Sequence, residues 1–182
     1  MRLSLYEFET GAETIGGDRI VYDLAGDKAY FGAAQVEGRA LVWQLDRDAA
    51  EAEGALLSHD VRLDPFADWV VRCDRVDFPR GGVAHLHTHP GPGIRYLLQG
   101  EIEIVTEGRS TFHGPGGTWF ESGPEPVLAR ASQHGETAFV RVLLLPAEWQ
   151  GKRTIRYVNP EDEGLPKLQR ATILLEHALT LR

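Results

Sequence analysis

The chain has 182 residues, of which 42% are apolar and 25% are charged, and its formal net charge is −8. This composition is typical of one globular domain with a sizeable core. An acidic chain without a basic run is poorly suited to bind nucleic acid or an anionic membrane, so we expect neither as a partner. Cys73 is the only cysteine, which excludes an internal disulfide and fits a reducing compartment.

The first nine residues lack the long apolar core of a secretory signal peptide. No apolar run approaches the roughly 20 residues needed to span a bilayer. We therefore expect a cytoplasmic protein.

Short β-rich runs bounded by Gly or Asp follow in the N-terminal part of the chain, and they predict strands at 19–23, 30–33 and 40–45. Residues 48–57 are rich in Ala, Leu and Glu and begin with Asp, so they predict a short helix.

The middle of the chain carries many short apolar segments separated by turn residues. We predict strands at 69–78, 83–89, 94–98, 101–106, 110–113, 118–121, 127–131 and 137–145. This spacing indicates an all-β sandwich or barrel rather than βαβ units. In the tail, 153–159 predicts a further strand, and 171–181 fits either a strand or a short helix.

Three histidines, His85, His87 and His89, alternate with single residues. Because strand side chains alternate between faces, this period of two predicts that all three project to the same side. Neutral imidazole is the commonest side-chain ligand for transition metals, so the row predicts a metal site. The sequence Pro-Gly-Pro-Gly at 90–93 then ends the strand.

The pattern Gly81, five residues, His87-x-His89 and Gly100 resembles the first motif of the cupin superfamily. That motif also contains a glutamate, and this chain has Gly93 in its place. Residues 115–127 resemble the second motif, in which a histidine stands where this chain has Val127. The resemblance covers about 68–146.

The resemblance implies an all-β, double-stranded β-helix (jelly-roll) barrel at about 68–146 in a single domain. The N-terminal strands within 1–67 and the C-terminal extension 147–182 would pack on this barrel or on the partner of a homodimer. It also implies a divalent transition metal (Fe, Zn, Mn or Ni) and a small-molecule ligand.

His87 and His89 match the motif and are the first candidate ligands. Two imidazoles need at least a third protein ligand, and His85, His113 and Glu121 are the candidates. The metal-free alternative is that the histidines are a polar lining of a binding cavity. His134, His177 and Cys73 fit ordinary loop, interface and core positions.

Arg95 lies two residues beyond Gly93 and should share its inward face. A buried guanidinium must be paired, so Arg95 has two possible partners: Glu121, or the carboxylate of a substrate. Turning to solvent is the third alternative. Tyr96, by alternation, should face the other way and serve packing.

No nucleophile elbow, phosphate loop or Cys–His pair is found, which disfavours hydrolase and phosphotransferase chemistry. The functional hypothesis is a metal-dependent enzyme that acts on a small anionic or enolisable molecule, with Arg95 and Glu121 in catalytic roles. With iron, the leading reaction type is that of an oxygen-dependent dioxygenase, an oxidoreductase. The alternative is a non-catalytic module that binds or senses a small molecule.

Overall fold

The computed structural model describes residues 1–47 and 52–181. These residues form three five-stranded sheets, and their helical segments are two short 3-10 turns, η1 (Ala147–Trp149) and η2 (Pro160–Gly164). The predicted all-β fold is confirmed. No helix in the described ranges has the length and apolar character needed to cross a membrane.

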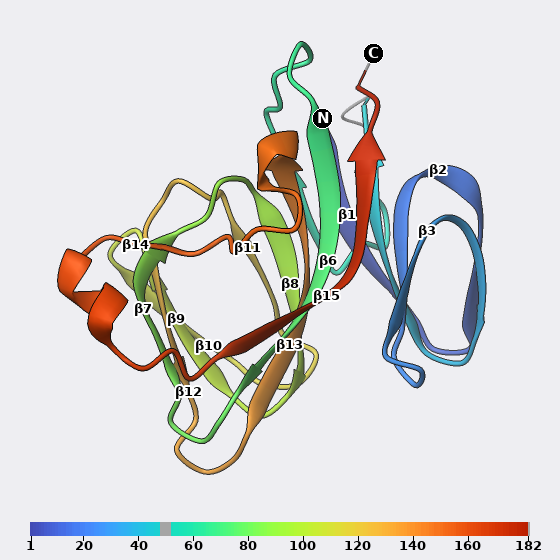
Figure 1. The fold of residues 1–182 in the computed structure, drawn as a ribbon. Helices are drawn as coiled ribbons and strands as arrows, with labels where there is room; N and C mark the ends of the chain where they lie inside the picture. The colour runs from blue at the N-terminus through green and yellow to red at the C-terminus, as the bar shows by residue number, and fades with distance from the viewer. Residues whose placement is uncertain (48–51, 182) are drawn as a thin grey trace.

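Two of the sheets face each other and enclose a β-barrel (Figure 1). One has the order β10-β9-β12-β7-β14, formed by β7 (Val83–Thr88), β9 (Ile102–Thr106), β10 (Arg109–His113), β12 (Val127–Ala131) and β14 (Arg156–Tyr157). The other has the order β11-β8-β13-β6-β15, formed by β6 (Trp69–Phe78), β8 (Gly93–Gln99), β11 (Thr118–Glu121), β13 (Thr137–Pro146) and β15 (Arg170–Leu179).

The third, N-terminal sheet lies beside the barrel (Figure 1). Its order is β3-β2-β4-β1-β5, formed by β1 (Arg2–Phe8), β2 (Gly11–Asp23), β3 (Lys28–Glu37), β4 (Ala40–Asp46) and β5 (Leu57–Asp60). Trp43 of β4 is fully buried, and its indole N–H donates to the carbonyl of Ile94 in β8 at 3.2 Å. Tyr96 points to the same sheet, where its hydroxyl donates to Glu7 at 2.9 Å.

The long apolar run at the end of the predicted barrel region forms strand β13, which is covered on both faces. Val140 and Val142 belong to the core shared with the N-terminal sheet, whereas Phe139 belongs to the barrel interior. A strand covered on both faces is expected to be apolar at successive positions. Arg141 interrupts the run and faces the barrel interior, where it requires a partner.

The helix predicted at 48–57 is not found in its described part. Residues 48–51 lie outside the described residues, 52–56 form a turn around Gly54, and β5 begins at Leu57. Gly54 has φ of +75°, a left-handed conformation that ends a helix, and β5 pairs with β1. Pairing with β1, rather than the helix propensity of its residues, therefore determines the conformation of the described part of this segment.

After β13 the chain wraps the barrel as a strap, here defined as residues 147–169 (Figure 1). The strand predicted at 153–159 shortens to β14, which pairs with β7 through Arg156↔Thr88 and Tyr157↔His87. The tail, for which strand and helix were both open, forms β15 and pairs along β6. The strap thus lies next to the histidine strand.

Candidate functional site

A β-bulge in β7 decides which histidines enter the barrel. Val127 of β12 lies opposite His87, and Ala129 lies opposite Ala84, so three steps along β7 match two along β12. The extra residue shifts the alternation, as bulges do. His85 therefore faces away, and its Nδ1 lies 3.9 Å from Asp162 of the strap. The expectation that all three histidines share a face is wrong for His85.

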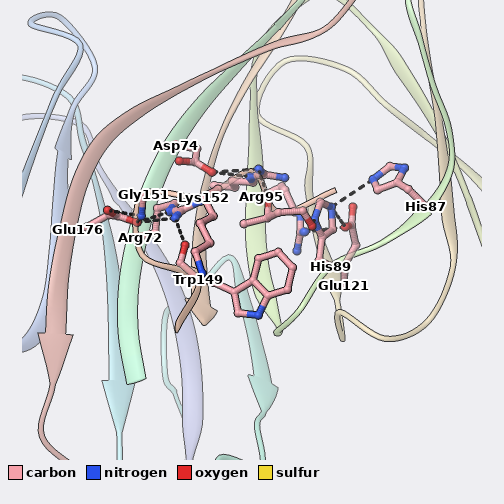
Figure 2. A network of polar contacts seen from close by, with 12 residues as sticks. Arg72, Asp74, His87, His89, Arg95, Glu121, Trp149, Gly151, Lys152 and Glu176 are labelled. Atoms are coloured by element: carbon pink, nitrogen blue, oxygen red, sulfur yellow. Dashed lines mark hydrogen bonds and ion pairs between the residues drawn. The ribbon is translucent and has the colours of Figure 1, made fainter. Parts of the chain in front are cut away.

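His87 and His89 are both buried and turn toward each other (Figure 2). Their Nε2 atoms are 3.2 Å apart, and the ring planes are nearly perpendicular, at 84°. His89 follows the end of β7, where its backbone N–H donates to Gly123. The structure thus brings together the two histidines that the motif singles out; their role as ligands stays a prediction.

The other ring nitrogens fix the tautomers. His87 Nδ1 lies 2.7 Å from the carbonyl oxygen of His85, and His89 Nδ1 lies 3.1 Å from that of Thr154. A carbonyl oxygen only accepts, so each Nδ1 carries a proton that it donates. In the neutral state both Nε2 atoms then present lone pairs, which face each other across 3.2 Å. This arrangement favours a cation between them, either a shared proton or a metal ion.

The geometry fits a metal ion. With metal–nitrogen distances of about 2.0–2.1 Å, two imidazole nitrogens on one ion lie roughly 3.0–3.4 Å apart. Burial lowers the pKa of His87, and burial together with the Arg141 charge holds the pKa of His89 well below the usual range. Both imidazoles therefore favour the neutral form, which is the form that ligates metals.

Glu121 supplies a carboxylate at the same place. Its Oε2 lies 3.5 Å from His89 Nε2, and its Oε1 accepts from the indole N–H of Trp119 at 2.8 Å. Arg95 approaches the same Oε2 with Nη2 at 2.6 Å, although the contact lacks the alignment of a hydrogen bond. Of the partners that the sequence left open for Arg95, the structure shows Glu121.

Arg95 is fully buried, and its Nη1 donates to the carbonyl of Gly93 at 2.6 Å. Burial lowers its pKa to about 10, so it remains charged at neutral pH. Arg95 and Glu121 therefore form an ion pair beside the two imidazoles. Within the described residues, no group of three or more His, Cys, Asp or Glu side chains is already arranged to hold a metal ion.

His113 does not join this group. It stacks on Trp119, with ring centroids 4.9 Å apart, and its Nε2 lies 3.2 Å from the hydroxyl of Thr111. Trp119, rather than His113, lines the cavity beside His87 and His89. That cavity has a volume of about 40 Å³ and is otherwise mostly apolar.

Arg141, Asp74 and Thr154 complete the site and were not predicted. Arg141 binds Asp74 of β6 through Nε at 3.1 Å and Nη2 at 2.9 Å, and Nη2 also reaches the Thr154 hydroxyl at 3.3 Å. Thr154 therefore links the Arg141–Asp74 pair to His89. The available signal was Arg141, the single charge within the apolar run of β13, since a buried charge requires a partner.

The two facing sheets form the all-β barrel that the sequence resemblance implied. No family model and no curated protein matches the chain. Among solved structures, an RmlC-like cupin from Shewanella frigidimarina shares 15% identity over 43% of this chain and 68% of its own, with a TM-score of 0.39.

Two solved structures of enzymes resemble this chain with similar sequence identities and TM-scores. The DMSP lyase DddQ from Ruegeria pomeroyi is 23% identical over 50% of this chain and 44% of its own, with a TM-score of 0.43. The polyketide cyclase RemF from Streptomyces resistomycificus is 21% identical over 53% of this chain and 71% of its own, with a TM-score of 0.41. These likenesses concern the fold alone. The chain itself folds as an all-β barrel of two facing sheets.

Proposed function

We propose that the protein is a metal-dependent enzyme that acts on a small organic anion. The observation that carries this proposal is the pair of Nε2 lone pairs of His87 and His89, which face each other because both Nδ1 protons are donated to backbone carbonyls. A divalent ion would be held by these two nitrogens, with Glu121 as the available carboxylate.

Charge balance favours an anionic substrate. Both imidazoles are neutral in their ligating form, and Arg95 compensates the charge of Glu121. A divalent ion here would keep nearly its full charge, which an anionic substrate oxygen neutralises. When bound, the metal supplies Lewis-acid polarisation of that oxygen.

The protein's own groups position the reactants. Trp119 and Arg95 hold Glu121 from two sides, so its carboxylate is fixed beside His89, where it would complete the ligand set of the ion. The small apolar cavity excludes bulk water from this place.

A particular reaction type is favoured by the donor set. Two histidines and one carboxylate match the side-chain types of non-haem iron oxygenases, which leave positions open for a substrate and dioxygen. Oxygen-dependent dioxygenation is the reaction we propose for an iron-loaded site. Its test is oxygen consumption by the iron-loaded protein over a panel of enolisable acids.

The second candidate is a non-catalytic binding or sensing module. The observation that favours it is the engagement of Glu121 by Arg95, which leaves two histidines as the uncommitted donors. Such a protein would bind a small molecule without turnover.

Elemental analysis of untagged protein tests whether the chain binds a metal ion. We expect close to one divalent transition-metal ion per chain, lost in His87→Ala and in His89→Ala. His85→Ala is the matched control, because His85 lies on the same strand but faces away, and it should keep the metal. Equal loss in all three variants, or no metal in the parent protein, would contradict the proposal.

A further inference from the structure

A second, larger cavity lies between the strap and the start of β15, with a volume of about 300 Å³. This is the lower end of the range of roughly 300–1,000 Å³ found for small-molecule sites. Arg141 and Asp74 lie at its inner end, and Lys152 and Lys167 lie at its exposed side. It shares Arg141, Ile155, Gln169 and Ala171 with the cavity of His87 and His89. The two cavities are therefore neighbours.

The larger cavity is cationic although the chain as a whole carries a net charge of −8. The charged residues that line it are Arg72, Arg141, Lys152, Arg153, Lys167 and Asp74. Glu176 and Glu163 also pair with members of this set, and positive charge remains in excess. No ion pair joins the amine of Lys152 to a carboxylate within the described part of the chain. A cleft lined by one sign of charge concentrates ligands of the opposite sign.

Arg141 offers a fixed anchor at the inner end. Its Nε and Nη2 atoms are used by Asp74 and Thr154, whereas no hydrogen bond of its Nη1 is found among residues 1–47 and 52–181. Because Arg141 is buried and held by two partners, its side chain would lose little further entropy when an anion binds there.

The same cavity contains hydrogen-bond acceptors without donors. Asp74 Oδ1 and Gln169 Oε1 are both buried and have no hydrogen-bond partner in the described structure. A buried acceptor without a donor is costly, and a ligand hydroxyl satisfies it. A site of this kind discriminates strongly against analogues that lack the hydroxyl.

We propose that this cavity binds a hydroxylated organic acid, with its carboxylate at Arg141 and its hydroxyls toward Asp74 and Gln169. This inference rests on the proposed function, for which it names the substrate class. The carboxylate end then lies beside Thr154, whose carbonyl holds His89. Lys152 and Lys167 attract the acid at the mouth.

Three six-carbon probes separate the contributions in calorimetric titrations of the full-length protein. Gluconate carries the carboxylate and the hydroxyls, sorbitol lacks the carboxylate, and hexanoate lacks the hydroxyls. We expect gluconate to bind at least tenfold more tightly than either of the others. Equal affinity for all three probes would contradict the proposed site. So would the absence of measurable gluconate binding at about 10 mM, a concentration that would reveal even a very weak complex.

Matched variants locate the binding. Lys152→Ala should weaken gluconate binding roughly threefold to tenfold, whereas Lys28→Ala, at an exposed lysine that does not line the cavity, should not change it. Gln169→Leu should narrow the gluconate–hexanoate difference at least threefold, and Gln133→Leu, in an exposed loop, should preserve it. Equal effects of the paired variants would show that binding lies elsewhere.

The titrations are run on metal-free and metal-loaded protein, so that the two proposals can fail separately. Selective gluconate binding by a chain that retains no metal would support the cavity and contradict the proposed function. Full metal content without gluconate selectivity would contradict the cavity alone.

Discussion

The Arg95–Glu121 pair places two opposite charges beside His87 and His89, where water has little access. A buried ion pair is expensive to break, because the remaining partner keeps an uncompensated charge. Arg95 lines neither of the two cavities, and we infer that it holds Glu121; a direct contact with a substrate stays a prediction.

A double-mutant cycle tests this role. Arg95→Met should lower the free energy of unfolding by about 3–5 kcal/mol, and the combination with Glu121→Gln should recover part of the loss. Arg130→Met is the control, since the Arg130–Glu103 pair is partly exposed and should contribute no more than about 1 kcal/mol. Independent effects of the two buried substitutions, measured by urea unfolding, would contradict the pairing.

The lowered pKa values of His87 and His89 predict a pH dependence for metal-free protein. Below an ordinary imidazole pKa of about 6.5, the unfolded chain takes up protons that the folded chain does not. The free energy of unfolding should therefore fall as the pH decreases from 7.0 to 5.5, by up to about 1.4 kcal/mol per pH unit for each imidazole.

Urea unfolding across that range measures the slope. His87→Asn should flatten it, whereas His134→Asn, in an exposed loop, should not. A slope unchanged by the loss of His87 would mean that other groups cause the acid sensitivity.

Sequence spacing predicted the meeting of His87 and His89 but misplaced His85. Alternation assumes a regular strand, and the bulge opposite Val127 and Ala129 depends on pairing with β12. The Arg141–Asp74 pair escaped prediction for a related reason. The two residues are 67 positions apart, and only the strand order places β13 beside β6.

At the scale of elements, the strap is held by a buried ion pair on its inner side (Figure 2). Arg72 of β6 donates to Glu176 of β15 at 2.6 Å and to the carbonyls of Trp149 and Lys152 at 2.6 and 2.8 Å. Glu176 also accepts the backbone N–H of Gly151. These contacts of Arg72 and Glu176, here called the clamp, hold residues 149–152 of the strap. Thr154, whose carbonyl fixes the tautomer of His89, follows two residues later in the sequence.

Glu176→Gln should loosen the clamp. We expect faster hydrogen exchange of the strap amides and metal affinity lower by roughly tenfold, the lower end of the effect of groups that orient metal ligands. Glu161→Gln, exposed in η2, is the control and should change neither. Faster exchange with unchanged metal affinity would separate the strap from the site.

The strands of the barrel were largely predictable, because apolar runs and turn residues define them in the sequence. The segment 48–57 was not, since its described part adopts its structure through Gly54 and through pairing with β1. The choice between strand and helix in the tail likewise depended on β6 as a partner.

At the scale of the whole molecule, the N-terminal sheet covers the outer face of the barrel sheet that contains β6, β8 and β13. One hydrophobic core includes residues from both of these sheets. Trp43→Ala removes a fully buried indole from this core and should cost about 3–5 kcal/mol. Because the core is shared, circular dichroism and tryptophan fluorescence should report one unfolding transition. Ile15→Ala, at a side chain that is 94% exposed, should cost less than about 0.5 kcal/mol.

Two separate transitions, with the barrel unaffected by Trp43→Ala, would contradict a shared core. The homodimer remains a prediction at this scale, and sedimentation of the full chain measures it.

The central claim is that one divalent ion binds between His87 and His89. Anomalous diffraction from crystals equilibrated with Co²⁺ tests it most directly. We predict one strong anomalous peak within about 2.0–2.2 Å of both Nε2 atoms, with both Nδ1 atoms still donating to the carbonyls of His85 and Thr154. A saturated crystal without a peak between the two rings, or with its peak at His85 or His113, would contradict the account.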